Sequence, residues 1–216
     1  MLLVCLAAPL AAGEPDYIES DGHLSDSDFY RLVACAAPPG DPCVRPMLRW
    51  RTDRPVTVTI ASVDPAFLGG KQLRARAALE RAVQYINTAD AGIRMQHVDG
   101  PADVRIHFVA SNGSAPLQNT GIDGADGLRV TGARVITWSR QDTHKIQRAT
   151  ILFGTRLHIR HYESAMLEEL TQALGLMTDI RNPYYEGVSI FSQDSNDTKQ
   201  FGAQDLMALR RHYPKE

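Results

Sequence analysis

The chain has 216 residues, with 23 lysines and arginines against 25 aspartates and glutamates, and 44% of its residues are hydrophobic. This length fits one domain or two small ones and is sufficient to bury a core. The near-neutral charge, with no run of basic residues, excludes a nucleic-acid binder that depends on a strong positive field. No apolar run reaches the roughly 18–20 residues that span a bilayer. We therefore expect neither a nucleic-acid partner nor a membrane span, and function has to be sought in local motifs.

The first 13 residues, M-L-L-V-C-L-A-A-P-L-A-A-G, are apolar and end in small residues. They resemble the apolar region and cleavage site of a secretory signal peptide, although a basic start is missing. This pattern predicts a periplasmic or secreted protein. Two alternatives stay open: a buried N-terminal element, and a lipid anchor at Cys5 that would make the chain a lipoprotein of the envelope.

Two further cysteines, Cys35 and Cys43, flank a stretch rich in proline and alanine. Turns in such a stretch can bring the two sulfur atoms together. In an oxidising compartment they are expected to form a disulfide within an N-terminal extension over residues 14–50. The alternative is a pair of free thiols in a cytosolic protein.

Hydrophobic periodicity predicts one α+β domain over residues 51–216, after a short helix that follows Ser25. Gly100 and Pro101 indicate a turn between two strands, and residues 111–132 read as a loop. The expected strands are 56–60, 93–98, 103–109, 134–138 and 148–153, and the expected helices are 71–90, 162–176 and 203–213.

The most informative segment is E-E-L-T-Q-A-L-G-L, residues 168–176. It resembles the active-site helix of zinc metallopeptidases of the matrixin type, whose motif is H-E-x-x-H-x-x-G-x-x-H. Glu169 aligns with the catalytic glutamate and Gly175 with the glycine of the turn. Glu168 and Gln172 replace two histidine ligands, and Thr178 stands at the third.

The resemblance extends from about Leu73 to Tyr213. Phe191 stands where these enzymes have the methionine of a conserved turn, and residues 205–213 are similar to their C-terminal helix. The E-E-x-x-Q-A-L-G form is itself similar to an uncharacterised family of proteobacterial envelope proteins. The resemblance implies a zincin-like single domain: a mixed twisted sheet packed with a long helix and the motif helix, followed by a C-terminal helix.

The replaced ligands argue against zinc, which favours imidazole and thiolate over a neutral amide. Glu168 and Gln172 are four residues apart on one helix face and can hydrogen-bond across the vacated positions. No cofactor is then expected, and Glu169 is catalytic only if activity remains. The alternative is a rebuilt site for zinc, or for calcium, magnesium or manganese, with ligands drawn from Glu168, Gln172, Asp179, His158 and His161.

These motifs favour a catalytically degenerate peptidase homologue that acts in binding or scaffolding at the cell envelope. Zincins hold an extended peptide beside an edge strand, and loss of zinc need not remove that binding mode. The candidate edge strand is 134–138, where Trp138 is either a contact residue or part of the core. The expected partner is a peptide or an envelope protein. The alternative function is a metallopeptidase with a non-standard ligand set.

Overall fold

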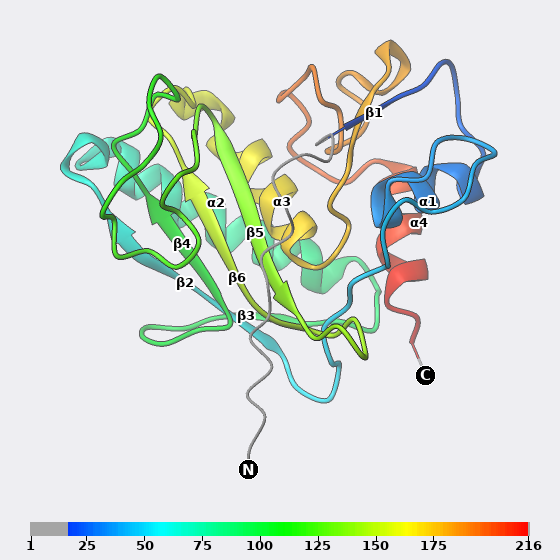
Figure 1. Ribbon diagram of the computed structural model, residues 1–216, viewed down its shortest axis with the longest axis horizontal. Helices are drawn as coiled ribbons and strands as arrows, with labels where there is room; N and C mark the ends of the chain where they lie inside the picture. The colour runs from blue at the N-terminus through cyan, green and yellow to red at the C-terminus, as the bar shows by residue number, and fades with distance from the viewer. Residues whose placement is uncertain (1–16, 216) are drawn as a thin grey trace.

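The computed structural model describes residues 17–215, and it shows a single α+β domain with a mixed five-stranded sheet and a C-terminal helix (Figure 1). The expected fold class is thus confirmed. The sheet has the order β3-β2-β4-β6-β5, with β5 antiparallel to β6 and the other neighbours parallel. Its strands are β2 (Val56–Val63), β3 (Met95–His97), β4 (Val104–Phe108), β5 (Ala133–Ser139) and β6 (Ile146–Phe153).

Gly100 and Pro101 lie between β3 and β4, as expected, but these two strands do not pair with each other. They lie on opposite sides of β2 and run parallel to it, so that Val58 is opposite both His97 and Val104. The turn residues are compatible with either path. A local turn pattern predicts the two strands but cannot show that a third strand lies between them in the sheet.

Two helices cover one face of the sheet: α2 (Gly70–Thr88) and α3 (Tyr162–Ala173). Residues at every second position of β4 point toward them, and Phe108 stacks on Phe153 of β6 with ring centroids 4.9 Å apart. This alternation of buried and partly exposed residues is what a strand with one covered face requires. None of the helices described between residues 17 and 215 is both long and apolar enough to cross a membrane.

The other face of the sheet is partly covered by residues 111–132, which lack regular structure. Ala125 and Val130 from this segment pack on Val109 and Leu152 in a small second core. Trp138 lies beside it, only 5% exposed, with the Arg148 guanidinium 4.5 Å from its ring centroid. Trp138 is therefore a core residue and not an exposed contact.

The N-terminal part packs at the end of the sheet where the C-terminal helix lies (Figure 1). Helix α1 (Asp26–Cys35) is capped by Ser25 and lies against α4 (Ala203–His212), while β1 (Tyr17–Glu19) pairs with β7 (Asp179–Arg181). Three short 3-10 helices, η1 (Pro65–Phe67), η2 (Ile159–His161) and η3 (Pro183–Tyr185), complete the described elements.

A disulfide joins Cys35, the last residue of α1, to Cys43. The pairing expected from the sequence is thus present, and it closes the proline-rich loop against the end of the helix. The expected signal segment, residues 1–13 with Cys5, lies outside the described residues.

Candidate functional site

The C-terminal end of α3 is held by side chains from distant parts of the chain. The Trp50 indole donates a hydrogen bond to the Ala173 carbonyl at 2.8 Å, and the Tyr213 hydroxyl donates to the Leu174 carbonyl at 2.6 Å. These bonds satisfy carbonyls that a helix end otherwise leaves without partners. The chain then turns at Gly175, whose φ is +103° and where a Cβ would clash with the Leu48 carbonyl. The glycine of the motif is therefore required by the backbone.

The polar residues of the motif gather between α3 and the start of β7. We call Glu168, Glu169, Gln172 and Asp179 the α3 acidic site. The Gln172 amide donates to Asp179 Oδ1 at 2.7 Å, and both Glu169 and Gln172 are less than 10% exposed. Gln172 thus bonds Asp179 and not Glu168, because β7 brings a carboxylate within reach of the amide.

The Glu168 carboxyl group lies in a strongly unfavourable place for a negative charge. Its side chain keeps some contact with solvent, but the carboxyl group lies deep enough that burial raises its pKa well above the usual value, helped by the negative charges of Asp179 and Glu169. Like charges in a partly dry environment favour a shared proton. Glu168 is therefore favoured in its protonated form.

The two histidines of the alternative ligand set have other roles. His158 is exposed and its Nδ1 accepts from the backbone N–H of Arg160 at 3.2 Å. His161 accepts from the Arg160 guanidinium at Nε2 and bonds the Asn196 carbonyl through Nδ1. Both ring nitrogens of His161 are thus engaged. Between residues 17 and 215, no three His, Cys, Asp or Glu side chains are grouped so as to hold a metal ion. The structure does not assemble the rebuilt ligand set.

Phe191, which the sequence comparison aligned with a methionine of the zincins, is fully buried. Its ring meets Phe29 of α1 at a centroid distance of 6.2 Å, and its carbonyl accepts from Ile180 of β7 at 2.7 Å. The turn therefore supports β7, which in turn carries Asp179 into the α3 acidic site.

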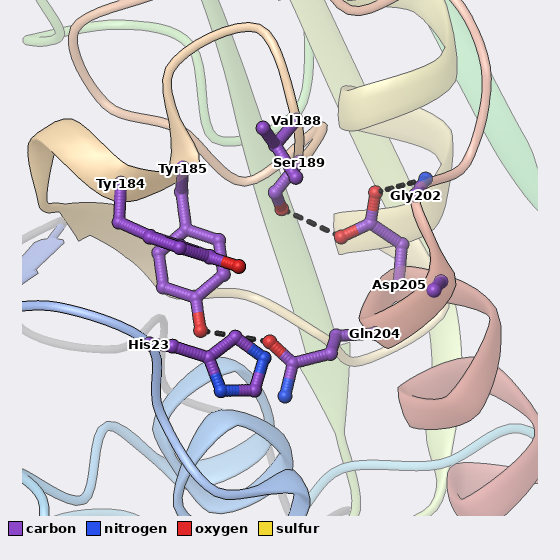
Figure 2. A pocket seen from close by; sticks show the side chains of 9 residues that line it. His23, Tyr184, Tyr185, Val188, Ser189, Gly202, Gln204 and Asp205 are labelled. Carbon is purple, nitrogen blue, oxygen red and sulfur yellow. Dashed lines mark hydrogen bonds between the residues drawn. The ribbon is translucent and has the colours of Figure 1, made fainter.

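Sequence reasoning did not single out Asp205 of α4, although the structure gives it a central place. Its carboxylate is fully buried and accepts from the Ser189 hydroxyl at 2.6 Å and from Gly202 N at 2.8 Å (Figure 2). It also accepts from Ile190 N at 3.0 Å. An aspartate at the third position of a helix is an ordinary capping residue. Nothing in the sequence pattern indicates that it also fixes a loop far from the helix.

The pocket in Figure 2 lies between this loop and the start of α4, away from the α3 acidic site. Its polar groups bond one another: the Tyr185 hydroxyl, for example, donates to Gln204 Oε1 at 2.8 Å. The pocket thus has a structural role in joining η3 to α4. It is lined by His23, Tyr184, Tyr185, Val188, Ser189, Gly202, Ala203, Gln204 and Asp205.

A second buried group that sequence reasoning missed is His212, near the end of α4. It is fully buried, bonds the Leu48 carbonyl through Nε2 at 2.7 Å and lies 3.3 Å from the Tyr30 hydroxyl through Nδ1. Burial, followed by the nearby charges of Arg49 and Lys145, lowers its pKa to about 4. His212 is therefore a neutral residue that ties α4 to α1.

Fold and site together define a single-domain α+β protein whose motif helix ends in an acidic site. Residues 30–216 match the family described as "Protein of unknown function (DUF2927)", and the chain belongs to this family. No curated protein matches the sequence.

Proposed function

We propose that this chain is an exported, zincin-like protein of the cell envelope that binds an extended peptide along β5 and has no catalytic zinc. The observation that carries the proposal is the position of β5, an antiparallel strand at the edge of the sheet and in contact with α3. The order of elements from α2 to α4 supports the zincin resemblance, and the disulfide supports an oxidising compartment.

The backbone pattern of β5 shows which groups are available to a peptide. Gly154 N–H donates to the Gly132 carbonyl at 2.7 Å, next to the pair formed by Ala133 and Phe153. In an antiparallel pair the backbone groups alternate in direction from one residue to the next. The N–H and carbonyl groups of Val135 and Thr137 therefore point away from β6. A peptide that extends the sheet would bond the groups of Val135, which is partly exposed, whereas Thr137 is only 5% exposed.

The α3 acidic site supports a preference for one type of peptide. Thr137 of β5 contacts the sulfur of Met177, 3.6 Å from its hydroxyl, and Met177 lies two residues before Asp179. A side chain that projects from a peptide on β5 toward α3 therefore lies close to Asp179 and Glu168. Because burial and the nearby charges of Asp179 and Glu169 raise the pKa of Glu168, an arginine or lysine side chain beside it would stabilise its ionised form.

Fluorescence anisotropy with a labelled peptide tests this proposal. The probe is a capped peptide of alternating valine and threonine with one central arginine, and its control has glutamate in place of arginine. We expect Val135→Pro, which removes an outward N–H, to weaken binding at least tenfold. The matched variant Val135→Thr keeps that N–H and should bind within about twofold of the parent. Equal binding by both variants would rule out pairing along β5.

A role of the α3 acidic site in binding can be tested separately, through proton release. Binding of the arginine peptide should release a proton from Glu168, which calorimetry detects when buffers of different ionisation enthalpy are compared. The glutamate peptide should show weaker binding and no such release. If the two peptides bind alike, β5 can still be the binding strand, but the preference for a basic side chain is wrong.

The metallopeptidase alternative is tested by elemental analysis of the purified chain. We expect no stoichiometric zinc, calcium, magnesium or manganese, and the same melting temperature with and without chelator. One equivalent of a metal, together with loss of a peptidase activity in Glu169→Gln, would overturn the non-catalytic proposal. In that case Glu169 would act as the base that activates the metal-bound water.

A further inference from the structure

The N-terminal end of α2 exposes two large apolar side chains. Leu68 is 57% exposed and Leu73 is 71% exposed, the largest fraction among the large hydrophobic side chains of residues 17–215. Neither belongs to a hydrophobic core of the described residues, whereas Phe67 beside them is 1% exposed and anchors the turn. This end of α2 projects on the side of the molecule opposite α1 and α4 (Figure 1).

Basic side chains flank Leu73 on the helical projection of α2. At about 100° per residue, Leu73 stands in the middle of the exposed face of α2. On that helical projection Arg76 lies on one side of it, and Arg74 and Arg81 lie on the other. All three arginines are exposed, as is Lys71 in the first turn. We call the two leucines with these four cations the α2 surface.

The charge of this surface differs in sign from that of the whole chain. Residues 64–81 contain four cations and two acids, Asp64 and Glu80, whereas the chain has a net charge of −2. Asp64 is engaged, since its side chain accepts from Ala66 N at 2.9 Å. No ion pair between described residues involves Arg74, Arg76 or Arg81. Their positive charges are thus available to an anionic partner.

We infer that the α2 surface binds an anionic lipid bilayer, with Leu68 and Leu73 inserted at the level of the acyl chains and the four cations on lipid phosphates. Apolar side chains at a projecting helix end, ringed by lysine and arginine, have the composition of a peripheral membrane contact. An interface with a protein would instead bury a broad area with aromatic residues at its centre. The α2 surface has two leucines and no exposed aromatic ring. This inference is independent of peptide binding at β5.

Vesicle co-sedimentation of the full chain tests the inference. The probes are vesicles of phosphatidylcholine alone and vesicles with about one third phosphatidylglycerol. We expect binding to the anionic vesicles only, decreasing at high salt because mobile ions screen the charges. Leu68→Ser combined with Leu73→Ser should lower the partition coefficient at least tenfold. Each of Arg74→Gln and Arg76→Gln should lower it about fivefold.

Two controls separate the α2 surface from the rest of the chain. Val44→Ser removes another exposed apolar side chain, 56% exposed, and Arg51→Gln removes a cation elsewhere on the surface; neither should change partitioning. Any contribution from residues 1–13 is common to all variants. Because Leu73 is 71% exposed, the leucine variants should keep the parent melting temperature.

The position of the leucines is checked with Leu73→Trp. Its emission should shift to shorter wavelength on anionic vesicles and be quenched by brominated acyl chains, while Trp50 and Trp138, each 5% exposed, stay unchanged. Equal binding to neutral vesicles, no binding at all, or full binding by the double serine variant would each overturn the inference. Binding of soluble polyglutamate at this surface without vesicle binding would assign it to an acidic protein instead.

Discussion

Two polar regions, the α3 acidic site and a second one around α4, place buried carboxyl groups in opposite electrostatic surroundings. We call the second one the α4 junction: Gly175, Asp205, His212 and their partners. The buried carboxylate of Asp205 has three hydrogen-bond donors at 2.6–3.0 Å, and they offset part of the effect of burial on its pKa, which is still raised. Glu168 of the α3 acidic site has two negative side chains near it, and these add to the effect of burial.

This difference separates a polar group that stabilises the fold from one that destabilises it. A buried charge that is fully hydrogen-bonded fixes the elements that supply its donors. A buried carboxyl group beside like charges lowers the stability of the folded chain and is retained where binding or chemistry needs it. By this criterion the α4 junction is the structural region, and the α3 acidic site is the region for which we propose a function.

The variant of the α4 junction with the largest expected loss of stability is Gly175→Ala. Alanine at φ +103° is strained, and its Cβ would clash with the Leu48 carbonyl and lie 2.9 Å from His212 Nε2. We expect a loss of about 3–5 kcal/mol in the free energy of unfolding, measured by urea denaturation. The control is Gly127→Ala, also at positive φ but with no atom within 4 Å of its Cβ, which should lose only the conformational part. Equal losses would mean that close packing at Gly175 is unimportant.

The next test removes the carboxylate of the α4 junction. In Asp205→Ala the backbone N–H groups of Ile190 and Gly202 lose their acceptor, so we expect a loss of about 3 kcal/mol in thermal or urea unfolding. Asp205→Asn retains one acceptor oxygen and should lose less. If the alanine and asparagine variants were as stable as the parent, the three hydrogen bonds would not be what holds this loop.

The α4 junction should also weaken in acid because of His212. Its pKa in the folded chain is about 4, below the ordinary value of 6.5, so the unfolded chain binds more protons between these pH values. The stability that neutral His212 provides is complete above pH 6.5 and decreases as the pH falls toward 4, by about 3 kcal/mol.

The comparison that isolates His212 is the pH dependence of unfolding in the parent and in His212→Asn. His107 on β4 shifts in the same direction, to a pKa of about 4, through burial and then Arg105, so the parent alone does not separate the two histidines. The asparagine variant should be less stable at pH 7 and have a shallower slope between pH 6.5 and 4. An unchanged slope would show that His212 is not the titrating group.

The sequence predicted those features that depend on residues near one another in the chain. The period of apolar residues predicted α2, the motif glycine marked the end of α3, and the cysteine spacing predicted the disulfide. The pairing of β2 with both β3 and β4 depends on contacts between distant segments. The bond from Gln172 to Asp179 likewise depends on how β7 returns past α3, and the helical spacing of Glu168 and Gln172 suggested a different pair.

The site was predicted only in part for the same reason. The motif located Glu168 and Gln172 but gave no reason to join His158 or His161 to them, and the structure keeps both histidines in η2 and its cap. Asp205 and His212 stood on an amphipathic helix, where a polar residue usually faces solvent. His212 is buried where α1 packs on α4, and Asp205 is buried where the loop with Ser189 returns to α4; no local pattern contains either contact.

The smallest expected effect is a gain in stability, not a loss, and it concerns the α3 acidic site. Because the pKa of Glu168 is raised in the folded chain, that chain holds a proton which the unfolded chain releases above about pH 4.5. The resulting loss of folding stability grows as the pH rises from that value to the pKa of Glu168 in the folded chain. Glu168→Gln removes it, so we expect a gain of roughly 0.5–2 kcal/mol at neutral pH and little change near pH 4. The same variant should abolish proton release on binding of the arginine peptide.

The matched control is Glu163→Gln, nearer the start of α3 and partly exposed. It should change neither the stability nor the proton release. If Glu168→Gln destabilised the chain as Asp205→Asn does, both carboxyl groups would be structural, and the α3 acidic site would lose its claim to function.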